Sequence, residues 1–150
     1  MPPRIGAEHH ARRPVSPRGK NLGVLWVCLF SLLVVHNAEE LLLGLPAWTR
    51  EHPWFPDRVS GSYDTFIPAV VVVICAGGVL AVYAVLRRPR WSRPALIVAT
   101  GLLALNAVSH IVASLVTQTV MPGLYSSVLI VVPCLLFLLW RLSSTARSTG

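Results

Sequence analysis

The apolar run from Asn21 to Pro46 contains the polar stretch His36-Asn37-Ala38-Glu39-Glu40. A run of this length can cross the roughly 30 Å hydrocarbon core of a bilayer as one helix. An ionisable side chain at membrane depth is costly, so three such residues in five positions are hard to explain as filler. We therefore expect this stretch to form part of a functional site.

The composition places the chain in a membrane. Its 150 residues are 54% hydrophobic and 13% charged, whereas about 25% of residues are charged in a typical soluble domain. Most of the basic residues lie beside apolar runs, at both ends of the chain and in residues 87–93. This placement follows the positive-inside rule and suits anionic lipid headgroups, so we expect membrane lipids as partners. The chain has no basic-aromatic motif for RNA or DNA, and no nucleic-acid partner is expected.

The distribution of apolar segments predicts an all-α fold, a four-helix transmembrane bundle. The membrane domain covers residues 22–140, with spans at about 22–46, 66–86, 94–118 and 124–140. The basic loop at 87–93 indicates the cytoplasmic side, and the loop at 47–65, whose acidic residues outnumber its arginines, the opposite side. Both termini are then cytoplasmic, with a disordered basic tail at 1–21 and a polar tail at 141–150. The expected location is the inner (cytoplasmic) membrane, which the chain crosses several times.

Several residues predict local features of these spans. Pro46 is expected to end the first span, and Pro133 to kink the fourth. The second span contains three small residues, Gly77, Gly78 and Ala81. Small residues let a neighbouring helix approach closely. A homodimer contact on that face is the weaker alternative. The pair at 126–127 (Ser-Ser) is expected to begin a separate polar patch near the outer end of the fourth span.

A second polar pair lies in the third span. Asn106 and His110 are four residues apart and therefore share one face of a helix. Because a helix rises by about 1.5 Å per residue, His36 lies roughly 24 Å along its helix from Lys20, and His110 lies roughly 25 Å along its own helix from Arg93. Both distances start from bases on the inner side, so the two histidines fall at the same depth. We predict that the two helices build one site.

Three chemistries fit the candidate site residues, which are His36, Glu39, Glu40, Asn106 and His110. All except Asn106 are candidate ligands for a divalent metal ion, Zn or Fe, and no other cofactor is indicated. A buried carboxylate beside an imidazole also makes an acid/base pair. Glu and His at membrane depth can instead relay protons. The non-functional alternative is that these groups only hydrogen-bond to each other and fix helix packing.

The chain resembles the HXXEE-domain family, bacterial integral membrane proteins named for the motif that here runs from His36 to Glu40. The resemblance extends to Pro46-Ala47-Trp48, to Asn106 with His110, and to Pro122-Gly123. It implies that the five candidate residues form the active site. It implies no substrate, because the function of the family is uncharacterised.

We expect a small membrane-embedded enzyme, metal-dependent or acid/base, that acts on a lipophilic small molecule. A pocket between helices would suit such a substrate. The alternatives are a proton-coupled transporter, disfavoured by the small size and by the lack of a detectable inverted repeat, and a non-catalytic membrane subunit whose polar cluster fixes packing.

Overall fold

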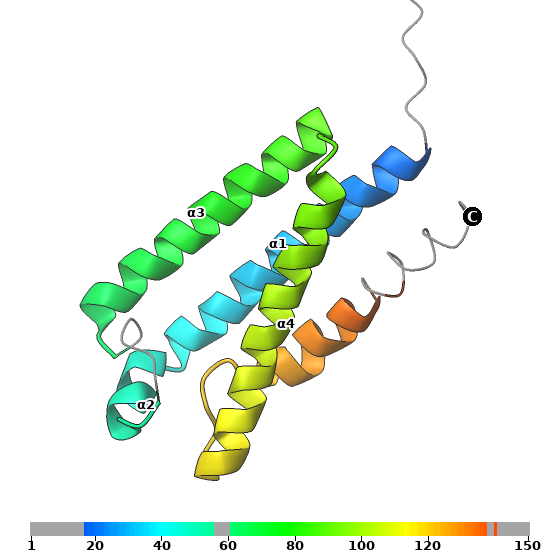
Figure 1. The fold of residues 1–150 in the computed structure, drawn as a ribbon. Coiled ribbons are helices and arrows are strands. Elements are labelled where there is room, and N and C mark those ends of the chain that lie inside the picture. The colour runs from blue at the N-terminus through cyan, green and yellow to red at the C-terminus, as the bar shows by residue number, and fades with distance from the viewer. Residues whose placement is uncertain (1–16, 56–60, 138–139, 141–150) are drawn as a thin grey trace, which may run out of the picture.

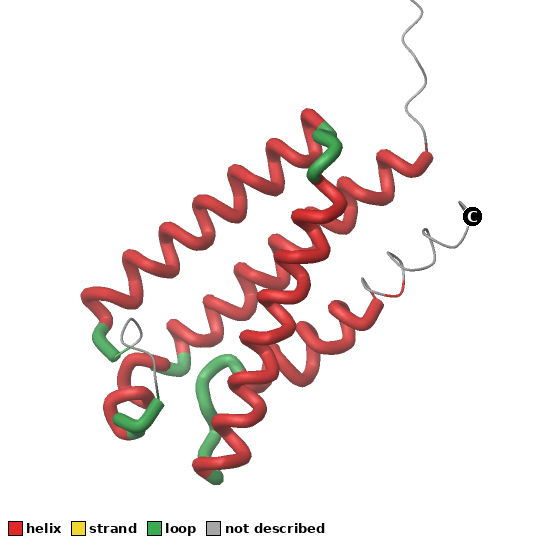
Figure 2. Tube along the Cα trace, viewed as in Figure 1, coloured by secondary structure: helices red, strands yellow, loops and turns green. Residues whose placement is uncertain are grey.

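The computed structural model describes residues 17–55, 61–137 and 140, and all the regular structure in these ranges is helical (Figure 2). The elements are α1 (Pro17–Leu42), α2 (Leu45–Glu51), α3 (Tyr63–Arg87), α4 (Ser92–Thr117), α5 (Leu124–Ser126) and the π-helical turn η1 (Ser127–Val131). The helix that begins with α5 continues through η1 to Phe137. We call this continuous segment, Leu124–Phe137, the last helix. The all-α fold class is therefore confirmed.

The other three long segments, α3, α4 and the last helix, are arranged around α1 (Figure 1). The helix α3 packs along one side of α1, while α4 and the last helix pack on the other side and on each other. The helices α3 and α4 meet at the short turn around residues 88–91 and diverge from there. The helix α1 consequently contacts all the other long segments, and its side chains can reach each of them.

Three of the helices are long and apolar enough to cross a membrane: Leu22–Leu42, Tyr63–Arg87 and Ser92–Thr117. They expose large apolar side chains such as Val72, Val79 and Leu105 on their outer faces, as expected for helices in contact with lipid. The protein is thus a multi-pass membrane protein. The last helix is shorter as described, so a fourth span, the sidedness of the termini and the identity of the membrane stay predictions.

The boundary at Pro46 corrects the expected end of the first span. The helix α1 ends at Leu42, and Gly44 adopts the left-handed conformation (φ 73°) that lets the chain turn. Pro46 then occupies the first turn of α2, where its missing N–H costs no helical hydrogen bond. Pro46 therefore helps to begin a helix instead of ending one. The segment expected to be a loop from residue 47 starts within α2.

Of the two predicted tails, the described residues cover only the end of the first. Residues 17–21 belong to α1 and are not a disordered tail, whereas residues 1–16 and 141–150 lie outside the described residues. In the last helix, the distortion expected at Pro133 takes the form of the turn η1, in which the Val132 N–H donates to the carbonyl oxygen of Ser127. We attribute this wider turn to Pro133, which has no N–H and whose ring crowds the preceding turn.

Two apolar clusters lie at different levels of the bundle. The larger joins α1, α3, α4 and the last helix, with Trp26, Leu96 and Val131 buried. The smaller joins α2, α3, α4 and the turn before the last helix, and includes Trp48 and Met121. Along the chain, residues 36–40 lie between Leu32 of the larger cluster and Leu45 of the smaller one. The polar motif is therefore preceded by a packed part of α1 and followed by the packed start of α2.

The small face predicted on α3 lies against α1. A Cβ atom added to Gly77 would lie 3.0 Å from Leu33 Cδ2, and one added to Gly78 would lie 3.2 Å from Phe30 Cζ. Glycine at these positions therefore allows the close approach of the two helices. At the other end of the larger cluster, Trp26 Nε1 donates a 2.7 Å hydrogen bond to Ser92 Oγ, which ties α1 to the start of α4.

Candidate metal centre

Four polar side chains from α1 and α4 meet in the interior of the bundle. His36 and Glu40 are one turn apart on α1, and Asn106 and His110 are one turn apart on α4, so each pair shares a face of its helix. His36 is 0% exposed, His110 2% and Glu40 6%. The structure thus brings His36 and His110 together, as their similar spacing from Lys20 and Arg93 predicts.

The two imidazoles point at one carboxylate oxygen. Glu40 Oε1 lies 2.8 Å from His110 Nε2 and 3.3 Å from His36 Nε2. The rings meet edge to face, with centroids 4.8 Å apart. Potential ligand atoms of His36, Glu40 and His110 all lie within 4.8 Å of one another. This is a buried His/Glu/His group that could hold a metal ion.

Asn106 completes the same polar group from α4. Its Nδ2 lies 2.7 Å from His36 Nε2 and 3.5 Å from His110 Nε2. The N–H can donate to an unprotonated imidazole nitrogen, and a rotation of the amide by half a turn would present the oxygen to the same two rings. Asn106 can therefore adapt to either protonation state of its histidine neighbours.

A chain of hydrogen bonds supports His36 from behind. His36 Nδ1 lies 2.8 Å from Ser126 Oγ, and the Ser126 hydroxyl donates to the Gly123 carbonyl oxygen at 3.3 Å. When the Ser126 hydroxyl donates to Gly123, its oxygen accepts from His36 Nδ1–H, which leaves the lone pair of Nε2 in the centre of the group. Metal-binding histidines commonly have such a partner on their other nitrogen.

Ser126 belongs to the site, which its place in the predicted fourth span did not indicate. We expected it to begin a separate polar patch, but it contacts His36 directly. One feature of the sequence could have placed Ser126 near His36. Ser126 comes three residues after Gly123, and the turn at Pro122-Gly123 returns the chain to the level of the stretch from His36 to Glu40.

Glu39 has a different role from Glu40. Glu39 Oε1 accepts hydrogen bonds from the backbone N–H groups of Gly123 and Tyr125 at 3.2 and 3.0 Å, and Oε2 accepts from Ser126 at 2.6 Å. The first N–H groups of a helix have no partner within the helix, and a carboxylate satisfies them with the favourable sign of charge. Glu39 therefore anchors the last helix on α1. It lies outside the His36, Glu40 and His110 group, and its expected place among the metal ligands is corrected accordingly.

Gly123 allows the turn to pass directly over both imidazoles. It has φ +96°, and a Cβ atom there would lie 2.7 Å from Cε1 and Nδ1 of His110 and 3.1 Å from Cε1 of His36. The backbone conformation favours glycine, and the lack of space for a Cβ atom requires it. His110 Nδ1, next to this turn, is buried without a hydrogen-bond partner in the described part of the chain.

These features define a class: a polytopic membrane protein with a buried His36/Glu40/His110 group between its helices. The chain belongs to the family described as "Protein of unknown function with HXXEE motif", which it matches over residues 26–138. The matched region contains every residue of the centre described above. No curated protein and no solved structure matches the chain.

Proposed function

We propose that the protein is a membrane-embedded enzyme in which His36, Glu40 and His110 bind a divalent metal ion beside a pocket for a lipophilic substrate. The observation that carries this proposal is the position of Glu40. Its carboxylate contacts both imidazoles and also lines an apolar pocket, so the polar group and the pocket share one wall.

The donor set supports a metal ion. Two donor atoms bound at about 2.0–2.1 Å to a tetrahedral Zn²⁺ lie about 3.3 Å apart. The separations from Glu40 Oε1 to His36 Nε2 and His110 Nε2, 3.3 and 2.8 Å, are near this value. Two imidazoles and a carboxylate form a catalytic type of set that leaves a position for water or substrate, and the same donors also suit Fe²⁺. When bound, such an ion polarises a substrate oxygen or lowers the pKa of bound water.

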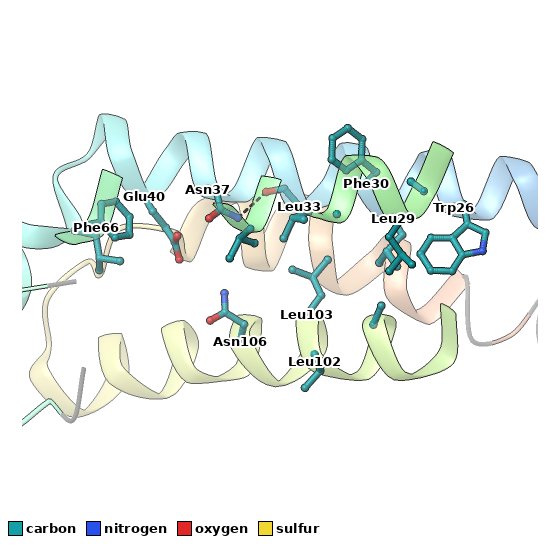
Figure 3. A pocket seen from close by; sticks show the side chains of 16 residues that line it. Trp26, Leu29, Phe30, Leu33, Asn37, Glu40, Phe66, Leu102, Leu103 and Asn106 are labelled. Atoms are coloured by element: carbon teal, nitrogen blue, oxygen red, sulfur yellow. Dashed lines mark hydrogen bonds between the residues drawn. The ribbon is translucent and has the colours of Figure 1, made fainter. Parts of the chain in front are cut away.

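The pocket supports a lipophilic substrate. It has a volume of about 450 Å³ and is lined by α1, α3, α4 and Leu45. Apart from Asn37, Glu40 and Asn106, its lining residues are apolar. Figure 3 shows these three polar side chains together in the half of the pocket away from Trp26. A ligand would thus bury its apolar part along the helices and present its polar part to Glu40 and Asn106.

A metal-free acid/base reaction is the second candidate. The 2.8 Å contact between Glu40 Oε1 and His110 Nε2 is a hydrogen bond through which a proton can pass. In this version the Glu40 carboxylate takes a proton from the substrate in the pocket. The hydrogen bond to His110 holds the carboxyl group of Glu40 in place before and after the transfer. Asn106 orients the substrate by its amide.

The enzyme proposal is tested by turnover of natural lipids. Purified protein is incubated with a lipid extract of its host membrane, with and without a chelator, and the lipids are analysed by mass spectrometry. We expect a lipid that is consumed by wild type and by Glu51→Gln, an exposed-carboxylate control on α2, but not by Glu40→Gln. Turnover that survives chelation would favour the acid/base version.

Two results would contradict the enzyme proposal. Proton or solute flux in proteoliposomes that depends on Glu40, with no lipid turnover, would make the protein a transporter. Neither flux nor turnover, with Glu40→Gln altering only the melting temperature, would leave a subunit whose polar group fixes helix packing.

A further inference from the structure

We infer that the pocket binds a single-chain lipid, which enters from the bilayer between α3 and α4 and places its polar end at Glu40 and Asn106. This inference rests on the proposed function for its site, but it concerns binding and can be tested without catalysis. The length of the pocket, its volume, its polarity and the exposure of its walls all support it.

The pocket is long. On α1 its lining residues run from Trp26 through Leu29, Leu33 and Asn37 to Glu40, in steps of three or four residues that keep to one face. At about 1.5 Å per residue, the distance from Trp26 to Glu40 is about 21 Å. This length exceeds half of the roughly 30 Å hydrocarbon core, so the pocket can take a whole lipid chain.

The pocket is also small. Its volume of about 450 Å³ lies toward the lower end of the roughly 300–1,000 Å³ of small-molecule sites. This volume favours a fatty or linear isoprenoid chain over a phospholipid, which would have to place two chains and a larger headgroup in the same space.

The two halves of the pocket differ in polarity. Asn37, Glu40 and Asn106 lie in one half, with Phe66 beyond Glu40, and Trp26 lies at the far end of the other half beside Leu29 and Phe30 (Figure 3). The Trp26 N–H is already bonded to Ser92, so Trp26 offers the pocket only its apolar ring. A chain with one polar end has one favourable orientation here, with the head beside Glu40 and the tail toward Trp26.

The wall between α3 and α4 is exposed. The pocket residues Leu102 of α4 and Val73 of α3 are 64% and 46% exposed, whereas Leu103 is 6% exposed. The two helices diverge from their connecting turn (Figure 1), and the pocket lies between them on α1. In a bilayer this side faces lipid tails, so an apolar chain can move into the pocket without crossing water.

The test uses a hexadecanol that carries a diazirine at the far end of its chain, added to the protein in phosphatidylcholine nanodiscs. After illumination, labelled residues are mapped by mass spectrometry. We expect labelling near Trp26 and Leu29 that unlabelled hexadecanol suppresses, and no such labelling by a phosphatidylcholine with a diazirine on one chain. Labelling spread over exposed residues such as Val72 and Val79, without competition, would overturn the inference. So would equal labelling of the pocket by the two-chain probe.

Matched variants locate the opening. Leu102→Trp narrows the exposed wall of the pocket, whereas Leu105→Trp changes an equally exposed residue of α4 that does not line it. We expect labelling about tenfold weaker in Leu102→Trp, which corresponds to about 1.4 kcal/mol, and unchanged in Leu105→Trp. An equal effect of both variants, or of neither, would overturn the lateral route.

A third variant separates this inference from the proposed function. His110→Ala removes a metal donor but does not line the pocket, so competitive labelling should persist in it. Competitive labelling of wild type that binds no metal would reject the metal centre and keep the lipid site. Metal binding by wild type without competitive labelling would reject the lipid site and keep the metal centre.

Discussion

Glu39→Gln should destabilise the protein but leave its metal in place, whereas Glu40→Gln should remove the metal. The adjacent carboxylates have separate partners in the structure. Glu39 accepts three backbone hydrogen bonds from the start of the last helix, and Glu40 contacts the two imidazoles. The two substitutions remove the same charge from neighbouring positions and therefore control for each other.

The magnitude follows from the contacts of Glu39. A glutamine oxygen in the place of Oε1 still accepts from Gly123 and Tyr125, but its NH₂ group then faces the Ser126 N–H, donor to donor. Leaving one partly buried N–H unsatisfied costs about 1–3 kcal/mol. The lost attraction between a negative charge and a helix N-terminus adds roughly 0.3–1 kcal/mol. We expect a total loss of about 1–4 kcal/mol.

The assay combines thermal unfolding in detergent with metal analysis after saturation. A loss of this size lowers the melting temperature by on the order of 10 °C in a chain of this length. We expect this drop in Glu39→Gln with a full metal complement, and no drop in Glu51→Gln. A melting temperature equal to that of wild type would refute the anchoring role. Complete loss of metal from a folded Glu39→Gln protein would show that Glu39 is itself a ligand.

Three further substitutions probe the surroundings of the centre. Gly123→Ala should lower stability by about 2–5 kcal/mol, since the strained backbone costs about 1–2 and the crowding of both imidazoles about 1–3; a melting temperature equal to that of wild type would contradict the close approach of the turn. Ser126→Ala should weaken metal binding about 10–100-fold in a titration, because His36 loses its supporting partner, and unchanged affinity would show that this hydrogen bond does not hold the ring. Trp26→Phe should lower the free energy of unfolding by about 1–3 kcal/mol in chemical denaturation, because the buried Ser92 hydroxyl loses its partner. An equal loss of stability in Trp26→Phe and in Trp26→Phe/Ser92→Ala would exclude the hydrogen bond as the cause.

The sequence predicted the parts of the fold that depend on apolar length and helical spacing. The expected spans at 66–86 and 94–118 lie within one or two residues of α3 (Tyr63–Arg87) and α4 (Ser92–Thr117) at most of their ends. The meeting of His36 with His110 followed from counting residues from the inner bases, because a helix in a membrane has a fixed rise and a fixed starting level. Such arithmetic works only for regular, continuous helices.

The remaining features depend on contacts between distant segments. Glu39 and Glu40 lie about 60° and about 40° to either side of His36 on an ideal helix, and nothing in that geometry tells which one meets His110. The start of the last helix decides between them. Its backbone N–H groups, more than eighty residues away in sequence, donate hydrogen bonds to Glu39. Pro46 was ambiguous for another reason, since proline is common both after helices and in their first turn.

Metal binding by purified protein tests the central claim most directly. Wild type, Glu40→Gln, His110→Ala and the control Glu51→Gln are stripped with a chelator, supplied in turn with Zn²⁺, Fe²⁺ and Mn²⁺, freed of excess ion and analysed for bound metal. The His36/Glu40/His110 centre predicts stoichiometric binding of Zn²⁺ or Fe²⁺ to wild type and Glu51→Gln, and its loss from folded Glu40→Gln and His110→Ala. Wild type that retains none of the three ions, or a folded Glu40→Gln protein that binds as tightly as wild type, would contradict it.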